Sequence, residues 1–420
     1  MKLEVDQSRL AQELETLGGI SEAPSPVTTR VVFTEADLRG RAFVKQLCRE
    51  AGLVMREDAV GNGFARWVGT EPDLPAVGTG SHIDAIPNAG RYDGTVGVLG
   101  GLEAIRALQR SGFRPRRSIE LLTFTSEEPT RFGIGCLGSR LLGGLLNPSV
   151  GEQLKDKNGT SLDDARTHAG FIGPLSDVRL PEDYYSAFVE LHIEQGPILE
   201  ARQFPIGVVT AIAAPASLRI SIEGEGGHAG AVLMPDRRDA FLAAAEIALA
   251  VESAARSTGA EDTVATVGVC DVFPGAVNSI PSRVRIELDV RDIDQSRRDG
   301  VLRKIAETCD EVATRRRVTL RIQPLNADPP AHCAPAVVNV LSEACETHGF
   351  GFMYMISRAY HDSLFLSRIV PTAMLFIPCR SGFSHRPDEY ASPEAIGHGT
   401  LVLAEALARL SGQDVIVNHA

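Results

Sequence analysis

One stretch restricts the fold more than any other: a short apolar run that ends at His82, followed by a glycine-rich loop to Asp93. The run, Leu74 to Gly78, predicts a buried strand, and residues 95–109 have apolar side chains at helical spacing. The loop between them brings an imidazole near a carboxylate, and both groups are ligands for divalent metals. The alternative is a strand–loop–helix connection with incidental polar residues. Further candidate ligands elsewhere in the chain are needed to favour the metal site.

Two further predicted strands also end in polar side chains. The strand at 118–125 is followed by Glu127 and Glu128, and the strand at 186–193 carries His192 near its end. Alternating strands and helices predict an α/β layer architecture, in which sites form beyond the carboxyl ends of the strands. Taken singly, adjacent glutamates are common and a strand histidine is more often a core residue. Together with the first histidine, these groups predict one shared site.

The pattern of elements changes near residue 212. From there to residue 328 the predicted order is β-α-β-β-α-β, which is typical of a split βαβ sandwich. We therefore expect a small domain, 212–328, inserted into a larger one formed by 1–211 and 329–420. The larger domain resumes with a helix, a buried strand and a closing helix at 335–349, 372–377 and 393–411.

Composition excludes several classes of protein. The chain has 420 residues and a net charge of −12, which argues against a nucleic-acid or acidic membrane surface as partner. The 7 cysteines are irregularly spaced without a Cys-x-x-Cys pair, which indicates reduced thiols. No apolar run reaches the roughly 18 residues of a membrane span, and the start of the chain is polar and acidic. We expect a cytoplasmic protein.

The candidate ligands suit a pair of metal ions. His385 lies in a loop after the final predicted strand and adds a fifth donor. Mixed nitrogen and oxygen donors without thiolate fit Mn²⁺, Zn²⁺, Co²⁺ or Ni²⁺, and one carboxylate would bridge the two ions. Of the paired carboxylates Glu127 and Glu128, one would hold metal and the other would take a proton from the metal-bound water. Asp84, two residues after His82, is placed to hold the other ring nitrogen of that histidine.

The inserted domain offers further polar candidates. His228 lies in a glycine-dense loop from which it could reach an oxyanion, although a flexible hairpin is the plainer interpretation. Asn278 and Arg291 lie near the two ends of one predicted strand. Arg291 is a natural bidentate partner for a carboxylate. A surface salt bridge with Asp289 or Asp292 is at least as compatible with its spacing.

The motifs together carry a family resemblance. They occur in this order along the chain: Gly80-Ser81-His82-Ile83-Asp84, Gly90-Arg91-Tyr92-Asp93-Gly94, Glu127-Glu128, His192-Ile193-Glu194-Gln195-Gly196-Pro197, Gly227-His228-Ala229-Gly230, Asn278-Ser279-Ile280-Pro281 and Ser384-His385. In these motifs the whole chain resembles the hydantoinase/carbamoylase family of metal-dependent amidohydrolases. That resemblance implies an aminoacylase/carboxypeptidase-like α/β fold, with a mixed sheet flanked by helices and an inserted βαββαβ domain that acts as a lid and dimerises.

The resemblance also implies roles for individual residues. Asp93 would bridge two ions, most typically Mn²⁺, with His82, Glu128, His192 and His385 as the other ligands. Glu127 would be the general base and Asp84 the residue that orients His82. Substrate contacts would come from Gln195, His228, Asn278, Arg291, Tyr360 and His361. The inserted domain would form a homodimer and deliver His228 and Asn278 to the site of the second copy.

One residue narrows the expected substrate. Carbamoylases and allantoate amidohydrolases usually have a Gly-Ala-Gly-His-Asp pattern where this chain has Arg358-Ala359-Tyr360-His361-Asp362. Tyr360 adds a hydroxyl and removes space, which suits a small polar substrate better than a long amino-acid side chain. The resemblance then implies cleavage of the ureido C–N bond of ureidoglycolate to glyoxylate, ammonia and carbon dioxide. The alternatives are an N-carbamoyl-L-amino-acid or allantoate amidohydrolase, and a relative that binds metal without turnover.

Overall fold

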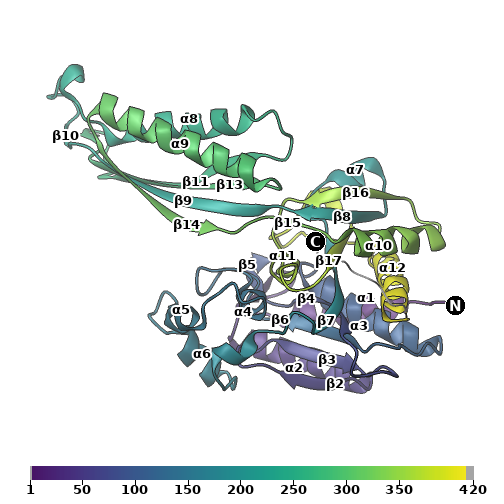
Figure 1. Ribbon diagram of the computed structural model, residues 1–420. Helices are drawn as coiled ribbons and strands as arrows, with labels where there is room; N and C mark the ends of the chain where they lie inside the picture. Colours follow the sequence, from purple (N-terminus) through teal and green to yellow (C-terminus); the bar gives the residue numbers. More distant parts are fainter. Residues whose placement is uncertain (1, 413–420) are drawn as a thin grey trace. The chain divides into compact units, whose positions relative to one another are not determined.

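The computed structural model describes residues 2–412, which divide into two compact units (Figure 1). The second unit consists of Ala211–His332 and Ile356–Tyr360, and the remaining described residues form the first. These bounds differ from the expected insert of 212–328. The short segment at 356–360 joins the second unit because the backbone N–H of Ala213 donates to the carbonyl of Ser357 at 2.8 Å.

A mixed sheet forms the centre of the first unit, with the strand order β8-β17-β7-β4-β6-β3-β2, and with β16 paired to β8. The strands are β2 (Val54–Glu57), β3 (Gly63–Trp67), β4 (Ala76–His82), β6 (Ile119–Phe124), β7 (Tyr185–Ile193), β8 (Ile206–Ile212), β16 (Phe352–Ser357) and β17 (Thr372–Ile377). Because β4 runs parallel to β6 and β7, and β17 parallel to β7, the carboxyl ends of these four strands lie at one edge. The predicted α/β fold with a mixed sheet is confirmed.

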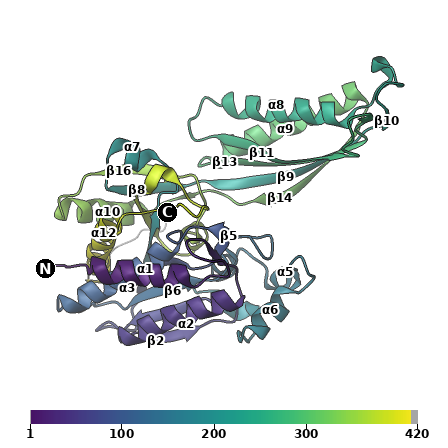
Figure 2. The same cartoon turned by 180° about the vertical axis from the view of Figure 1, so that it is seen from behind.

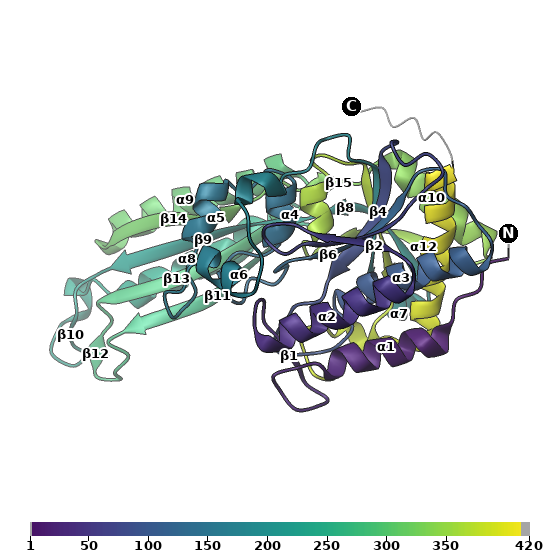
Figure 3. The same cartoon turned by 90° about the horizontal axis from the view of Figure 1, so that it is seen from below.

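Helices cover both faces of this sheet, because side chains alternate along each strand. On β6, Leu121 packs against Gly101 of α3, whereas the next residue, Leu122, shares a core with Leu137 of α4 and Leu366 of α11. On the first face α3 lies beside α12, and α1 lies alongside α3 (Figures 2 and 3). The helices are α1 (Gln7–Gly19), α2 (Glu35–Glu50), α3 (Thr95–Arg110), α4 (Leu137–Leu142), α5 (Pro148–Gln153), α6 (Leu162–His168), α7 (Ile198–Arg202), α10 (Pro335–Thr347), α11 (Asp362–Leu366) and α12 (Pro393–Gly412). Among the described helices, none combines the length and the apolar character that crossing a bilayer requires.

The second unit is a four-stranded antiparallel sheet with two helices on one face (Figure 1). Its strands, in the spatial order β11-β13-β9-β14, are β9 (Ala214–Glu223), β11 (Val264–Phe273), β13 (Arg283–Asp292) and β14 (Thr319–Ala327). Helices α8 (Ala240–Arg256) and α9 (Gln295–Arg316) bury alternate strand residues such as Ile220 and Ile286. The short strands β10 (Gly227–His228) and β12 (Ser279–Ile280) pair with each other, and the unit also has a 3₁₀ turn at Met234–Asp236. Its last strand, β15 (Ala331–His332), pairs with β8 and extends the mixed sheet.

The stretch from Leu53 to Ala65 forms a hairpin, because the Asp58 carboxylate accepts the backbone N–H groups of Val60 and Asn62 and turns the chain. Two local predictions were wrong. The strand expected from Asn278 is interrupted at Pro281, so β12 and β13 are separate. The loop between His82 and Asp93 contains a further strand. That strand is β5 (Ala85–Ala89), which pairs with β1 (Thr28–Arg30).

The polar segment at 146–184 contains α5, α6 and a 3₁₀ turn at Leu175–Val178. Asn147 and Ser161 cap the two helices by accepting backbone N–H groups of the first turn. Capping therefore begins these helices although they are too short for a clear apolar periodicity.

Candidate metal centre

The sheet edge in the first unit gathers the five expected ligands. His82 is the last residue of β4, His192 the penultimate residue of β7, and Glu128 follows the end of β6. Asp93 lies two residues before α3, and His385 follows the 3₁₀ turn at Arg380–Gly382. All but His385 are buried. Parallel strand order therefore brings together side chains that are as many as 303 positions apart in the sequence, from 82 to 385.

The donor atoms form two groups that share Asp93. Its Oδ1 lies 3.6 Å from His82 Nε2 and 3.2 Å from His192 Nε2. His385 Nε2 lies 3.4 Å from Asp93 Oδ2 and 3.3 Å from Glu128 Oε1. Within each group the donor atoms are within 4.8 Å of one another. Nitrogen and oxygen donors arranged around the two oxygens of one carboxylate fit a pair of divalent cations.

Backbone carbonyls orient the two buried histidines. His82 Nδ1 lies 3.0 Å from the carbonyl oxygen of Asp84, and His192 Nδ1 lies 2.8 Å from that of Ile193. A carbonyl only accepts, so each Nδ1 carries a hydrogen, and Nε2 is the ring nitrogen that faces Asp93. The backbone N–H of Gly94 also donates to His192 Nε2 at 3.1 Å. Both rings are thus fixed in the tautomer that a cation would need.

The carboxylate of Asp84 was expected to hold His82 Nδ1, but it accepts hydrogen bonds from other groups. Its Oδ1 is 3.6 Å from His82 Nδ1, which is beyond a hydrogen bond. Instead, Oδ1 and Oδ2 accept the backbone N–H groups of Glu127 and Glu128 at 3.2 and 3.1 Å. The side chain is buried, and the two N–H groups in the turn after β6 satisfy it. Asp84 therefore orients His82 through its backbone and shapes the Glu127–Glu128 turn through its side chain.

Gly94 makes room for the cluster. Its φ is +67°, a region that L side chains rarely adopt, and a Cβ there would lie 2.5 Å from His82 Nε2. A side chain at this position would displace the histidine or the loop. Glycine is therefore required at the start of α3 for the Asp93 loop to approach β4.

Proton binding in the cluster follows from its charges. Burial by itself would raise the pKa of Asp93, but hydrogen bonds from His192, His385 and His82 bring it well below its ordinary value. Contacts with Asp93 and Glu128 raise the pKa of His385 to about 11. Histidine protons thus bind at the atoms that a cation would use. Metal binding at this cluster must therefore release protons.

Glu127 stands apart from both groups of donors. Its Oε2 is 3.9 Å from His82 Nε2, and its Oε1 is 3.4 Å from the thiol of Cys136. Burial, reinforced by the negative charges of Glu128, Asp362 and Asp93, raises the pKa of Glu127 well above its usual range despite His82. A carboxyl group that is not a ligand and holds a proton readily is suited to general acid–base chemistry.

Several buried polar residues beside the donor cluster do not belong to any of the sequence motifs. Glu190 accepts the hydroxyls of Ser81 and Ser363 at 2.7 and 2.6 Å, and it forms a third potential metal-binding group with His192 and His361. Its position two residues before His192 in the same strand was an available signal, since alternate residues share a face. Glu389, which contacts the Asp93 loop, had no such signal.

Gln195 and His361, two expected substrate contacts, lie within this cluster. Gln195 Nε2 donates to Asp93 Oδ2 at 2.6 Å. The His361 ring is 4.5 Å from that of His192, and burial followed by the nearby positive charge of His192 lowers the pKa of His361 well below its ordinary value. The structure therefore places a neutral imidazole and an amide beside the expected ligands.

The remaining expected contacts belong to the second unit. His228 and Asn278 are exposed and lie together, because β10 pairs with β12 and the N–H of Ala229 donates to the carbonyl of Asn278. Arg291 lies near the opposite end of β13, where it donates to Asp289 at 2.8 Å and to the carbonyl of Arg358 at 3.1 Å. The salt bridge left open as an alternative for Arg291 is present. Tyr360 is partly buried at the end of the 356–360 segment.

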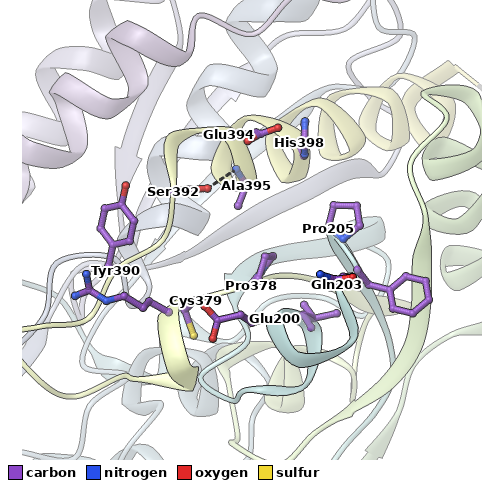
Figure 4. Close-up of a pocket in the computed structure, with 13 residues that line it drawn as sticks. Glu200, Gln203, Pro205, Pro378, Cys379, Tyr390, Ser392, Glu394, Ala395 and His398 are labelled. Atoms are coloured by element: carbon purple, nitrogen blue, oxygen red, sulfur yellow. Dashed lines mark hydrogen bonds between the residues drawn. The ribbon is translucent and has the colours of Figure 1, made fainter.

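The first unit also contains a cavity of about 450 Å³ (Figure 4). Some residues of its wall are close to His385 in the sequence. The cavity is lined by α7, by the segment that follows α7 and by the start of α12, with Cys379 and Arg380 from the loop that leads to His385. None of the five expected ligands lines it. The cavity is therefore separate from the donor cluster.

Comparison with known proteins gives consistent matches. A family model described as peptidase family M20/M25/M40 matches residues 78–409, a range that contains all five expected ligands. An Arabidopsis thaliana protein named ureidoglycolate hydrolase is 54% identical over 418 residues, covering 97% of this chain and 87% of that protein. The N-carbamoyl-L-amino acid amidohydrolase of Geobacillus stearothermophilus is 39% identical, covering 97% of this chain and 99% of that one. A solved structure of AtUAH in complex with glyoxylate superposes with a TM-score of 0.88 at 53% identity, covering 97% of this chain and 98% of that one.

Proposed function

The chain belongs to peptidase family M20/M25/M40, a family of hydrolases, and from that premise we propose that it hydrolyses the ureido C–N bond of ureidoglycolate. One observation carries the proposal: two groups of donors share Asp93, and the buried carboxyl of Glu127 lies beside them without belonging to either. A hydrolase acting on an unreactive urea needs this combination of an electrophilic site and a base. The 54% identity to a ureidoglycolate hydrolase supports the substrate.

The proposed reaction consumes one water molecule. Water attacks the ureido carbonyl, its bond to the terminal nitrogen breaks and releases a first ammonia, and the resulting carbamate loses carbon dioxide. The nitrogen left on the hydroxyl-bearing carbon then departs as ammonia and leaves an aldehyde, so that the products are glyoxylate, carbon dioxide and two molecules of ammonia. The glyoxylate held in the AtUAH structure supports this product.

Two divalent cations would be held at the donor cluster, with Mn²⁺ as the first candidate. His82, His192 and Asp93 would hold one cation, and Asp93, Glu128 and His385 the other. When bound, such ions polarise a carbonyl group and make water more acidic. The buried Nε2 atoms of His82 and His192 are oriented for this purpose by backbone carbonyls.

Glu127 would move the proton. As the base it takes a proton from the attacking water, and it then returns that proton to the departing nitrogen. Its raised pKa suits both steps, because a carboxyl in this environment holds a proton more readily than an exposed glutamate. The hydrogen bonds from the Glu127 and Glu128 N–H groups to Asp84 keep the base and its neighbour in a fixed turn.

Four residues would contact the substrate from the same copy. Gln195 and His361 lie in the cluster itself and offer neutral hydrogen-bonding groups. Tyr360 precedes His361 directly in the chain and would limit the space for a side chain. Arg291 would bind the substrate carboxylate, for which its guanidinium has to exchange its present partner Asp289.

A homodimer would complete the site. From Arg283 to Arg291, β13 spans eight residue steps, or roughly 25 Å of extended chain, and His228 and Asn278 lie beyond its first end. One copy therefore cannot bring both Arg291 and His228 onto one small substrate. We assign His228, as a stabiliser of the oxyanion, and Asn278 to the site of a second copy. Mixing the Glu127→Gln and His228→Ala variants tests this assignment: recovery of activity in the mixed dimer supports it, and no recovery contradicts it.

A reducing compartment, the cytoplasm, suits the thiols. All seven cysteines are free, and Cys270 is exposed. In an oxidising compartment an exposed thiol is prone to oxidation or to intermolecular pairing. Cell fractionation followed by immunodetection of the protein tests this placement.

The second candidate function is hydrolysis of an N-carbamoyl-L-amino acid, supported by the 39% identity to an enzyme with that name. The protein should be stripped with a chelator, reloaded with Mn²⁺ and assayed for ammonia and glyoxylate. Ureidoglycolate, allantoate and a set of N-carbamoyl-L-amino acids would be compared, with Glu127→Gln as the control for contaminating activity. A higher kcat/KM for ureidoglycolate supports the proposal. A preference for a carbamoyl amino acid contradicts the proposed substrate. Metal binding without turnover of any of these compounds contradicts the proposal that the protein is an enzyme.

A further inference from the structure

We propose that Glu389 is a positioning residue that holds the Asp93 loop and the His385 loop in the arrangement that two cations require. This inference rests on the metal site in the proposed function and assigns a role to a residue outside its ligand set. Among the described residues, Glu389 belongs to none of the groups whose donor atoms converge closely enough to hold an ion. Its action must therefore pass through other residues.

The Glu389 carboxylate binds the Asp93 loop by its backbone. Oε1 accepts the N–H groups of Tyr92 and Asp93 at 2.7 and 3.1 Å. Glu389 is 4% exposed and its bond to the Asp93 N–H is buried, so that N–H has no water as a ready substitute. These hydrogen bonds connect Glu389 to Tyr92 and Asp93, which lie 297 and 296 positions earlier, immediately before α3.

The other oxygen of Glu389 reaches the His385 loop. Oε2 accepts from the hydroxyl of Ser384 at 3.0 Å, and the same hydroxyl is within hydrogen-bond distance of Asp93 Oδ2. Ser384 directly precedes His385, which lies 3.4 Å from that same Asp93 oxygen. One carboxylate therefore connects the backbone of the bridging ligand to the residue beside a ligand of the second group.

The packing around Glu389 leaves it little freedom. A Cβ on Gly90 would lie 2.3 Å from Glu389 Cβ and 2.5 Å from its Oε1. The loop from Gly90 to Asp93 is therefore closed tightly around this side chain. Shortening or removing the carboxylate leaves two N–H groups unpaired and lets the loop shift, and because Asp93 serves both groups of donors, both cation sites weaken together.

Changes to groups that support metal ligands typically cost 10–100-fold in metal affinity. We expect a loss of that size, about 10–100-fold in Mn²⁺ affinity at both sites, for Glu389→Ala and Glu389→Asp. The aspartate keeps the charge but withdraws the carboxylate by one carbon–carbon bond. Glu389→Gln keeps the length and one acceptor oxygen, so it should recover most of the lost affinity. Recovery by glutamine but not by aspartate identifies reach, and not charge, as the property that matters.

The experiment measures Mn²⁺ binding by competition with a chromophoric chelator, with wild-type protein and the three variants, alongside ammonia release from ureidoglycolate. Glu200→Ala is the matched control, because Glu200 accepts the N–H of Ser381 in the same loop at 2.7 Å but touches neither Asp93 nor Ser384. Its Mn²⁺ affinity should equal that of the wild type. Thermal unfolding without metal shows whether each variant is folded, and Glu389→Asp remains informative if Glu389→Ala is not.

The outcomes separate this inference from the proposed function. Wild-type affinity in Glu389→Asp, or equal losses in Glu389→Gln and Glu389→Asp, overturns the positioning role while the enzyme assignment stands. A wild-type protein that neither binds Mn²⁺ nor releases ammonia overturns the proposed function itself. Weak binding by Glu389→Asp with recovery in Glu389→Gln supports the inference.

Discussion

Replacing Glu127 by glutamine separates the base from the metal ligands. The two side chains have nearly the same shape, so the change removes the ability to accept and return a proton and little else. Glu127 belongs to neither group of donor atoms around Asp93, and its nearest imidazole nitrogen, on His82, is 3.9 Å away. We therefore expect Glu127→Gln to bind Mn²⁺ as the wild type does.

The expected loss is in turnover. General acid–base catalysis contributes ~10²–10⁴-fold, which corresponds to about 3–5 kcal/mol of transition-state stabilisation at ~1.4 kcal/mol for each factor of ten. The loss should appear in kcat with KM nearly unchanged, since the base acts only in the transition state. The fold should not suffer, because burial already raises the pKa of this carboxyl and a neutral amide meets no such penalty.

The assay is ammonia release from ureidoglycolate at saturating substrate, with metal content measured on the same preparation. The neighbouring change, Glu128→Gln, is the control, since Glu128 Oε1 lies 3.3 Å from His385 Nε2 in the second donor group. That variant should lose metal as well as activity. If Glu127→Gln loses metal, or if its turnover falls less than about tenfold, the division of roles between the two glutamates is wrong.

Three further changes test other parts of the molecule. Gly94→Ala should lower Mn²⁺ affinity more than tenfold, about 1.4 kcal/mol, because its Cβ would lie 2.5 Å from His82 Nε2; Gly112→Ala, also at positive φ but with open space around it, should not. Arg291→Ala should raise KM ~30-fold, because a charge-assisted contact contributes about 2 kcal/mol. Arg285→Ala, on the same strand, is the control and should leave KM unchanged. An unchanged KM in Arg291→Ala would exclude the binding of the substrate carboxylate by Arg291. Hydrogen bonds from Arg315 and Arg316 lower the pKa of Glu246 to about 2 from its ordinary 4.5, so these pairs stabilise the fold above pH ~4.5 and cease to do so as the pH falls toward 2. Glu246→Gln should therefore lower the free energy of unfolding by ~1 kcal/mol at pH 7 and leave it unchanged near pH 2. Thermal unfolding across this pH range is the measurement, and a loss that does not depend on pH would refute the prediction.

Local patterns in the sequence determined the α/β architecture and the members of the donor cluster. The apolar run before His82, the apolar strand before Glu127 and the strand carrying His192 each have the continuous burial of a parallel strand, and parallel strands present their carboxyl ends at one edge. Helical periodicity fixed α3 and α12 within a few residues. These features depend on neighbours at most four positions away, so they are visible in the chain itself. The ligand roles and the inserted domain's function stay predictions.

Turns and hydrogen-bond partners were decided by the tertiary structure alone. The Asp84 carboxylate was expected to serve His82, two residues away, yet it accepts N–H groups 43 and 44 positions further on. Glu389 had no recognisable pattern, because its partners lie almost 300 positions earlier in the chain. A buried carboxylate takes whichever donors the folded backbone presents to it, and spacing along the sequence does not encode that choice. The sequence therefore specified the five side chains that form the donor cluster, and only the packed structure decided which groups hold them there.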